Sequence, residues 1–510
     1  MRARFYVSAL GKKDSFRETY NLLVEGYGLI GKESEMCVQE IMSAIVTKVK
    51  AVLEKAEEVL DGKLTPQQAE RVSRVLNEVA STAWVEGFRT WLEKQEIDVP
   101  AVEVEGETYR FKLDSDKEFL TPGGWMRLRR RLYQRDEGGP CYIPLDAAWG
   151  MEGQFATVEV RDAVLFSMAL STAQETETLL KKCALFQPGE TAIKTMARQM
   201  GKWLEEHEDQ ILPAIRREEA VPKRSRVVCA SLDGTNVLLA EHGKKRGRPA
   251  ERPVSNRAAE DGPTCYKNAM VGSIRLYGAV PEGAVSPERL VSRYVARMPE
   301  DRYPTLKAKF EKELQALEDR LDDEIVRIVL NDGARGLWEY VDQTPLYDNY
   351  EKLVDYHHTT EHLSRAAEAL FGKGSEESQR WYDRYREVLK EDDGGARSVI
   401  RSMDYYGEAR TLSKSRREAL RVERTFFMNN QHRMEYARFR RNGWPIGSGP
   451  VEAACKSVVK TRLGRSGMRW SRSGGQHILT LRTYVKSDRW DAMWKRFKRM
   501  QGGPRYSVAP

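Results

Sequence analysis

The 510-residue chain has little of what marks a membrane-spanning or secreted protein. Its longest apolar stretch, Ala163–Leu170, is interrupted by Ser167 and is far shorter than the roughly 18 residues that a membrane span needs. The basic start of the chain is not followed by an apolar run long enough for a signal peptide. We therefore expect a cytoplasmic protein with no membrane partner.

Cysteine is also scarce. The six cysteines, none of them in a Cys-x-x-Cys pair, are Cys37, Cys141, Cys183, Cys229, Cys265 and Cys455. This scatter argues against a disulfide framework and against a thiolate zinc site. We expect the thiols to be reduced and mostly structural.

Positive charge is concentrated at one end of the chain. Residues 411–510 carry 23 Lys and Arg against 6 Asp and Glu, a net charge of +17, whereas residues 1–410 carry −9. Such a local field favours a polyphosphate partner, because each neutralised phosphate releases counterions. A solvated basic tail is the alternative.

Hydrophobic periodicity divides the first 220 residues into three parts. A helical period from Glu33 to Glu96 predicts an N-terminal helical domain in 1–100. Alternation on either side of Pro122-Gly-Gly predicts a β-ribbon with a basic face in 101–150. Two helices around a Pro-Gly turn in 151–220 resemble a helix-turn-helix, with Lys194, Arg198 and Lys202 on one face of the second helix. Helix pairs with a Pro-Gly turn are common, so simple helix packing is the favoured explanation of that last pattern.

The remainder of the chain predicts an α/β ribonuclease-H-like catalytic domain. We expect its first part in 221–358, an all-α insertion in 359–446, and completion of the core with a basic region in 447–510. The expected elements are strands at 226–233, 236–241 and 266–277, a helix at 305–321, a strand at 324–332 and a short strand ending at His358. Three strands, a helix and two further strands follow the order of that fold.

Three acidic residues lie where such a domain needs metal ligands. Phosphodiester cleavage requires an activated oxygen nucleophile and a stabilised leaving oxygen, which two Mg²⁺ ions bound by carboxylates supply. Asp233 and Asp332 each follow an apolar run and precede a glycine, which permits close approach of a substrate or metal, and Glu452 lies at the start of a helix. Taken singly, the aspartates suit turns and the glutamate suits a helix dipole.

The order of the motifs resembles a bacterial insertion-sequence transposase of the DDE class, of the Kra-type insertion-sequence family with more distant Mutator-like relatives. The motifs that carry the resemblance are Ser231-Leu-Asp-Gly-Thr, Leu330-Asn-Asp-Gly, Asp355-Tyr-His-His, Gly447-Ser-Gly-Pro-Val-Glu-Ala-Ala-Cys-Lys, Arg462-Leu-Gly-Arg-Ser-Gly-Met-Arg-Trp-Ser and Leu481-Arg. The resemblance covers residues 220–490, and Pro144-Leu-Asp extends it toward the N-terminus. Relatives often carry paired cysteines before that segment, whereas this chain has only Cys141, so a zinc ribbon there is doubtful.

The resemblance implies that Asp233, Asp332 and Glu452 are a metal-binding triad for two Mg²⁺ or Mn²⁺ ions per active site. It also implies that His358 lies beside the triad, with Asp355 fixing its tautomer. A capped helix start near Thr359 is the structural alternative. A zinc site built on His357, His358 and His362 is disfavoured, since no cysteine accompanies them and adjacent side chains diverge on a strand.

Several basic residues are candidates for holding DNA. Lys456 and Lys460 follow Glu452 at spacings of four on one helix face, and Arg462, Arg465, Arg469 and Trp470 extend that surface. Trp470 as a core anchor is equally consistent with the pattern. Arg246-Gly-Arg-Pro resembles an AT-hook core, so Arg246 and Arg248 are further candidates, although a generic basic loop has the same composition.

These features together predict a Mg²⁺-dependent DDE transposase that binds terminal repeats, cleaves DNA and joins the 3′-hydroxyl ends to target DNA. Its expected partners are DNA and a second copy of the chain, as a homodimer or higher oligomer, in the bacterial cytosol and nucleoid. Involvement of RNA stays open. Two alternatives are a related structure-selective nuclease that does not join ends, and a DNA-binding protein that has lost catalysis.

Overall fold

The computed structural model describes residues 32–136, 138–183, 186–240, 266–284, 286–447, 449–501 and 506–508. The chain divides into two compact units, Met1–Met196 with Trp494–Pro510, and Ala197–Met493. Among the helices in the described ranges, none has the length and apolar character needed to cross a membrane.

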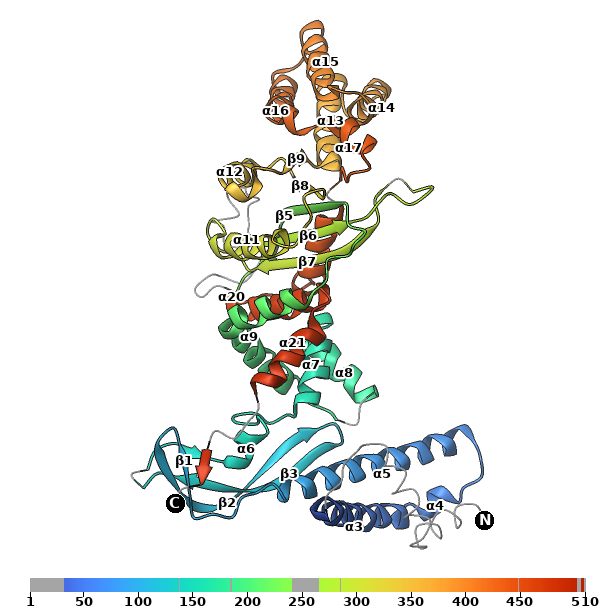
Figure 1. Ribbon diagram of the computed structural model, residues 1–510. Helices are drawn as coiled ribbons and strands as arrows, with labels where there is room; N and C mark the ends of the chain where they lie inside the picture. Colours follow the sequence, from blue (N-terminus) through green and yellow to red (C-terminus); the bar gives the residue numbers. More distant parts are fainter. Residues whose placement is uncertain are drawn as a thin grey trace. The chain divides into compact units, whose positions relative to one another are not determined.

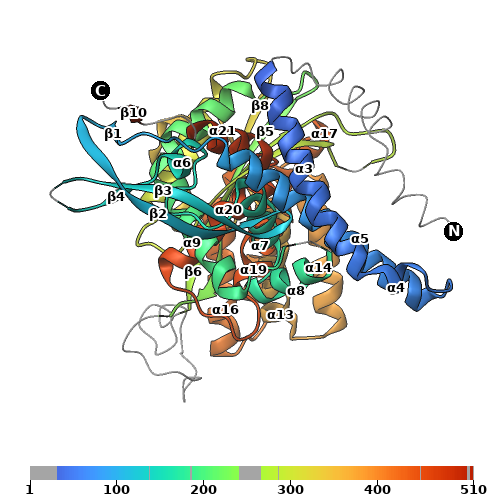
Figure 2. The same ribbon diagram turned by 90° about the horizontal axis from the view of Figure 1, so that it is seen from below.

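The first unit begins with a pair of long helices. Helices α3 (Lys32–Lys55) and α5 (Pro66–Glu93) lie side by side, with the short α4 (Glu57–Leu60) between them in sequence (Figures 1 and 2). Thr65 caps α5 by accepting a hydrogen bond from the Gln68 N–H at 3.0 Å, and Pro66 occupies the first helical turn. The predicted helical pattern is confirmed.

A five-stranded antiparallel sheet follows in the same unit. Its order is β10-β1-β2-β3-β4, built from β1 (Ala101–Val104), β2 (Glu107–Thr121), β3 (Gly124–Gln134), β4 (Cys141–Tyr142) and β10 (Tyr506–Val508). Helix α5 packs on β3 (Figure 2). The turn at Pro122-Gly123 agrees with the prediction, whereas the pairing of β10 with β1 was not predicted.

The ribbon's face differs from the expected basic surface. Arg127 and Arg129 on β3 pair across the strands with Asp116 and Asp114 on β2, so exposed charges of both signs alternate. Inside the same unit, the Arg130 guanidinium contacts Asp146 of α6 (Pro144–Ala148) at 2.6 Å, and both side chains are buried. The Pro-Leu-Asp segment therefore anchors α6 to the sheet.

Helices α7 (Val158–Leu170) and α8 (Ala173–Cys183) complete the described part of the first unit before α9. Helix α9 (Glu190–Glu218) begins one residue earlier and ends twelve residues later than the 191–206 helix proposed for DNA reading. It passes from the first unit into the second at Met196.

The second unit is built on a mixed sheet of order β7-β6-β5-β8-β9 (Figure 1). The strands are β5 (Val227–Leu238), β6 (Tyr266–Tyr277), β7 (Arg289–Arg297), β8 (Val326–Asn331) and β9 (Glu351–Val354). Strands β5, β6 and β7 pair antiparallel, and β5, β8 and β9 pair parallel. The unit is therefore mixed α/β, as predicted.

The first three strands of the sheet are formed by other residue ranges than those predicted. Residues 226–233 and 236–241 were expected to form two strands separated by a turn at Asp233-Gly234, but β5 is one strand through both residues. Its pairing with β6 is continuous from Val227↔Tyr277 to Leu238↔Tyr266, and this ladder overrides the turn preference of Asp-Gly. The third strand is β7, which was not predicted.

Helices cover the two faces of this sheet. Alternate residues of β5 point to opposite faces. Val228, Ala230 and Leu232 pack with α11 (Pro304–Glu318) and α12 (Arg335–Gln343), which is followed by the 3₁₀ turn η1 (Pro345–Tyr347). Val227 and Cys229 face the opposite side, in a core shared with the helical insertion.

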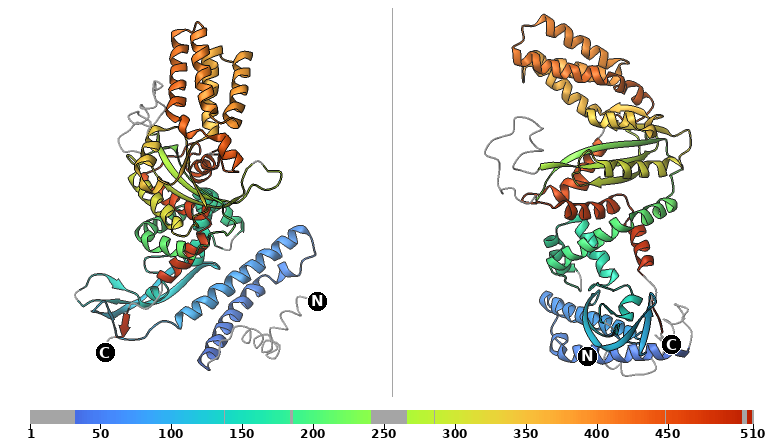
Figure 3. Two further views of the ribbon diagram at one scale, coloured as in Figure 1. Left: turned by 45° about the horizontal axis from the view of Figure 1, so that its top comes forward. Right: turned by 90° about the vertical axis from the view of Figure 1, so that its left-hand side faces the viewer.

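The insertion is all-helical, as predicted, and forms a bundle seen in both views of Figure 3. It comprises α13 (Tyr356–Phe371), α14 (Glu376–Glu391), α15 (Gly395–Ala409), α16 (Lys414–Asn430), the turn η2 (Gln431–Arg433) and α17 (Tyr436–Arg441). Its core contains Leu363, Phe427 and Tyr436, which are contiguous with Ile328 and Leu330 of β8. The bundle is thus fixed to the sheet by a shared hydrophobic cluster.

The chain then returns to the sheet through an irregular helix. Helix α18 (Gly449–Ala454) continues into a π-helical turn, η3 (Cys455–Lys460), and α19 (Thr461–Leu463). Helix α20 (Arg472–Lys486) packs on β7 and η3, and Trp490, Trp494 and Phe497 of α21 (Trp490–Met500) are buried. In the buried core the Arg482 Nε donates to the Val458 carbonyl at 2.6 Å, which satisfies an acceptor of the π-turn.

Candidate active site

Two of the three predicted acids face each other across adjacent strands. The parallel register pairs Cys229 with Ile328 and Ala230 with Val329. Continued by three residues, this register sets Asp233 of β5 opposite Asp332, the residue that follows β8. Neighbouring strands lie about 4.8 Å apart and both residues have the same parity on their strands, so the two carboxylates share one face of the sheet.

Asn331 holds this alignment beyond the end of the regular pairing. Its Oδ1 accepts a hydrogen bond from the Leu232 N–H at 2.7 Å, and the Asn331 side chain is fully buried. The Asn331 carbonyl accepts from the Asp355 N–H at 2.8 Å. The residue immediately before Asp332 is therefore bonded to the strands on both sides.

The third acid comes from the returning helix. Helix α18 and turn η3 pack against β5 and β6, and Glu452 is exposed on α18. Burial raises the pKa of Asp233, and the negative charges of Asp332 and Glu452 raise it further, while hydrogen bonds from Cys455 and the Gly234 N–H oppose the shift. The three carboxylates thus lie close enough for their charges to interact.

Cys455 is a contact that the sequence motifs did not predict. It is buried on η3, and its thiol donates a hydrogen bond to the Asp233 carboxylate. Burial, together with that negative partner, raises the pKa of the thiol well above its usual range. The neutral thiol fixes the returning helix to the central strand at the position of the acid.

The donor set suits a hard divalent cation. Carboxylate oxygens from β5, from the end of β8 and from α18 are the ligand type that Mg²⁺ prefers. Burial is the main cause of the raised pKa of Asp233, and repulsion from Asp332 and Glu452 adds to it; a bound cation would offset both effects. Within the described ranges, no three His, Cys, Asp or Glu side chains converge in the ligand arrangement of a metal site.

The glycines beside the two aspartates have packing roles. A Cβ on Gly333 would collide with the Phe426 ring, and one on Gly234 would approach the Met270 sulfur at 2.6 Å. Both glycines were expected to admit a substrate or metal to the backbone. In this structure the space beside Gly234 and Gly333 is occupied by hydrophobic side chains.

Asp355 and His358 begin helix α13 at the carboxyl end of β9. The Asp355 Oδ1 accepts a hydrogen bond from the His358 N–H at 2.6 Å, so this buried aspartate is the N-cap of the helix. The expectation that His357 and His358 diverge on a strand was wrong, because the strand ends at Val354 and helical geometry starts with Tyr356. The predicted capped start thus falls at Asp355, not near Thr359.

The basic residues after Glu452 separate into exposed and buried sets. Lys456, Lys460, Arg465 and Arg469 are exposed. Arg462 is only 2% exposed, and its guanidinium lies 5.0 Å from the centre of the Trp470 ring, so it does not present a surface for a phosphate. Trp470 donates from Nε1 to the Leu463 carbonyl at 3.1 Å, and its backbone pairs with the end of β5. These contacts favour the anchoring role of Trp470.

The other predicted DNA contacts lie elsewhere. Lys194, Arg198 and Lys202 are exposed along α9, and Lys194 forms an ion pair with Glu190 at 2.6 Å. Arg246 and Arg248 fall outside the described residues. Cys141 is an exposed free thiol on β4.

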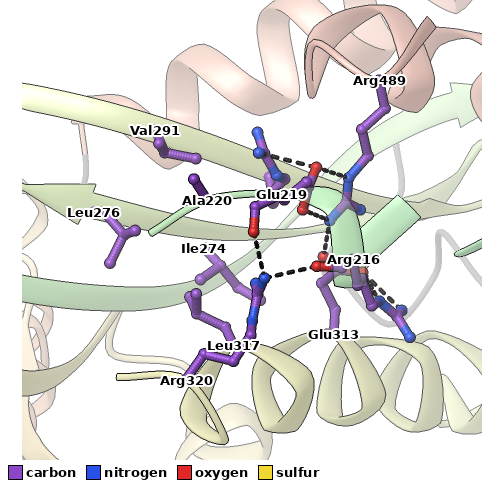
Figure 4. A pocket seen from close by; sticks show the side chains of 11 residues that line it. Arg216, Glu219, Ala220, Ile274, Leu276, Val291, Glu313, Leu317, Arg320 and Arg489 are labelled. Atoms are coloured by element: carbon purple, nitrogen blue, oxygen red, sulfur yellow. Dashed lines mark hydrogen bonds and ion pairs between the residues drawn. The ribbon is translucent and has the colours of Figure 1, made fainter. Parts of the chain in front are cut away.

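A separate cavity in the second unit is lined by charged residues and has a structural role. Arg489 contacts both Glu219, at 2.7 Å, and Glu313, and Arg216 contacts Glu313 at 2.7 Å (Figure 4). The enclosed volume is about 20 Å³, room for little more than a water molecule. The network joins α9, α11 and the segment before α21.

Comparisons with known proteins do not assign a family. No protein-family model matches the chain, and no curated protein matches its sequence.

Proposed function

We propose that the chain is a DDE transposase that cleaves DNA at the ends of its element and joins the 3′-hydroxyl ends to target DNA. The strand order β7-β6-β5-β8-β9, with three antiparallel strands followed by two parallel ones, supports a ribonuclease-H-like catalytic domain. The all-helical insertion between β9 and the glutamate-bearing helix supports the same assignment.

One observation carries the proposal. Asp233, Asp332 and Glu452 come from positions 99 and 120 residues apart, and the charges of the last two act on the first. Nothing in the local sequence requires Asp233 and Asp332 to share one face of the sheet with Glu452 near enough for its charge to act on Asp233. Their gathering is explained if a divalent cation and a phosphodiester occupy that face.

In this proposal Asp233, Asp332 and Glu452 hold two Mg²⁺ or Mn²⁺ ions, which activate an oxygen nucleophile and stabilise the leaving oxygen when bound. The exposed Lys456 and Lys460 hold backbone phosphates beside Glu452. Cys455 orients Asp233 by hydrogen bonding, and Asn331 keeps Asp332 level with it.

The test is cleavage of duplexes that carry the repeats flanking the chain's own coding sequence. Asp332→Ala is expected to lower the cleavage rate by a thousandfold or more, since losing a ligand removes about 4 kcal/mol or more of transition-state stabilisation. DNA binding in a mobility-shift assay should change little. Asp323→Ala, on the loop before β8, is the matched control and should retain full activity.

A second assay supplies pre-cleaved ends with a free 3′-hydroxyl and a target plasmid. Joined product that depends on Asp233, Asp332 and Glu452 is the expected result. Cleavage without joining would assign the chain to the nuclease class, and normal cleavage by Asp332→Ala would remove that residue from the site.

A further inference from the structure

A buried carboxylate and two histidines form a continuous chain of contacts between α13 and α16. The Glu423 Oε2 lies 2.6 Å from the His362 Nδ1, and the His362 Nε2 lies 3.3 Å from the His358 Nε2. Glu423 is 6% exposed, whereas a third of the His358 side chain is accessible. This series of contacts therefore extends from Glu423 in the interior of the helical bundle to the partly exposed His358 ring.

The Glu423–His362–His358 contacts lie beside the turn that contains Asp332. The Phe426 ring stacks on the His362 ring with centroids 3.5 Å apart, and the same Phe426 occupies the space beside Gly333. Asp355, which caps the helix bearing both histidines, donates its backbone N–H to the Asn331 carbonyl at 2.8 Å. The His358 ring is thereby held near the end of β8.

The contacts determine which ring nitrogens carry protons. Burial lowers the pKa of His362, with Glu423 opposing and Arg365 and His358 adding to the shift, so the ring is neutral near pH 7. An ionised carboxylate accepts only, which places the His362 proton on Nδ1 and leaves its Nε2 as an acceptor. The His358 Nε2 must then donate, and in the neutral ring this leaves the His358 Nδ1 as the acceptor.

The charged groups around the two rings are consistent with this assignment. The second oxygen of Glu423 accepts from the Arg365 Nε at 3.0 Å, which orients the carboxylate. The Glu361 Oε2 lies 3.9 Å from the His358 Nδ1. At that distance the Glu361 carboxylate makes no direct hydrogen bond to the His358 ring.

We propose that Glu423 and His362 are positioning residues that hold His358 as the tautomer whose Nδ1 accepts a hydrogen bond from the attacking water or the 3′-hydroxyl. The inference rests on the transposase proposal and adds to it the role of the helical insertion, which supplies Glu423. Asp355 has a different task, since its Oδ1 accepts from the backbone of His358 as the helix cap.

The decisive variant is Glu423→Gln. Because the Arg365 Nε–H requires an oxygen, the new amide would present its NH₂ group to the His362 Nδ1. Both rings would then switch tautomer, and the His358 Nδ1 would carry a proton. We expect the cleavage rate to fall by about a hundredfold, the lower range for loss of acid–base assistance. Glu423→Asp, which keeps an ionised acceptor, should recover most of the rate.

Histidine ¹⁵N NMR gives a readout that is independent of activity. With His358→Gln used for assignment, the His358 Nδ1 should resonate as an unprotonated nitrogen in the wild type and as a protonated one in Glu423→Gln. Glu418→Gln, on the exposed side of the same helix, is the control and should change neither the spectrum nor the rate.

A protonated His358 Nδ1 in the wild-type protein would overturn the inference even if Glu423→Gln did not fold. An unchanged cleavage rate in a folded Glu423→Gln protein would overturn it as well. If Asp332→Ala remains inactive in that case, the transposase proposal stands, but without a role for the Glu423–His362–His358 contacts. If Asp332→Ala is active, the underlying function is wrong.

Discussion

At the scale of single residues, Asn331 makes the contact on which the position of Asp332 depends. Strand β8 ends at this residue, and its side-chain amide replaces the backbone pairing that the strand no longer provides to β5. Without this hydrogen bond, the backbone at Asp332, which lies beyond the end of the strand, could adopt another turn conformation. The buried amide fixes the turn at the level of Asp233.

Asn331→Ala is expected to lower the free energy of unfolding by about 1–3 kcal/mol, because it leaves the buried Leu232 N–H without an acceptor. Urea denaturation monitored by circular dichroism measures this loss. Asn236→Ala, at an exposed position of the neighbouring strand, should stay within about 0.5 kcal/mol of the wild type. A loss below that value for Asn331→Ala would mean that the contact does not hold the strand ends.

At the scale of elements, the buried charge network joins α9 and α11 to the segment before α21. Burial alone would raise the pKa of Glu313, but Arg489 and Arg216 reverse that effect and hold it below the usual value. Glu219 is similar, with its pKa lowered by Arg489 and Arg293 against the effect of burial. The arginines that compensate the two buried carboxylates thus decide whether these elements stay together.

Arg489→Ala is expected to cost about 3–5 kcal/mol of unfolding free energy, because two buried carboxylates lose their shared partner. Wild-type stability from Glu219 and Glu313 should be present above the unfolded glutamate pKa of about 4.3 and be lost as pH falls through their lower folded pKa values. In Arg489→Ala those pKa values rise, so destabilisation should extend to higher pH.

Chemical denaturation from pH 3 to pH 8 tests both effects. Arg335→Ala removes an exposed arginine that pairs with Glu339 one turn away, and should change stability by less than about 0.5 kcal/mol at any pH. Equal losses in the two variants would show that burial of the network is not what stabilises it.

At the scale of the whole molecule, the net charge of +17 in residues 411–510 creates a positive local field, which under the proposed function would hold DNA phosphates. The structure shows which residues supply accessible positive charge. Arg462 is buried, whereas exposed positions are held by Lys456, Lys460, Arg465 and Arg469. Charge counted from the sequence therefore overstates the charge available to a phosphate.

Single alanine substitutions at Lys456, Lys460 or Arg469 are each expected to reduce the slope of log K against log salt by about 1 for duplex DNA. Binding isotherms between 50 and 200 mM salt measure that slope. Lys181→Ala, an exposed lysine of α8, should leave it unchanged. Arg462→Ala should lower stability instead, and a slope change there without loss of stability would contradict its structural role.

The sequence by itself determined the helical character of residues 33–96, the turn at Pro122-Gly123, β8 and the all-helical insertion, because periodicity and turn residues are local signals. It also singled out Asp233, Asp332 and Glu452. It did not determine that β5 runs unbroken through Asp233, that β7 completes the sheet, or that Arg462 is buried. Those features depend on pairing and packing between residues distant in sequence. Tertiary structure alone brought Asn331 and Cys455 to the acids and Glu423 to His362, since hydrogen bonds between distant segments leave no periodic pattern in the chain.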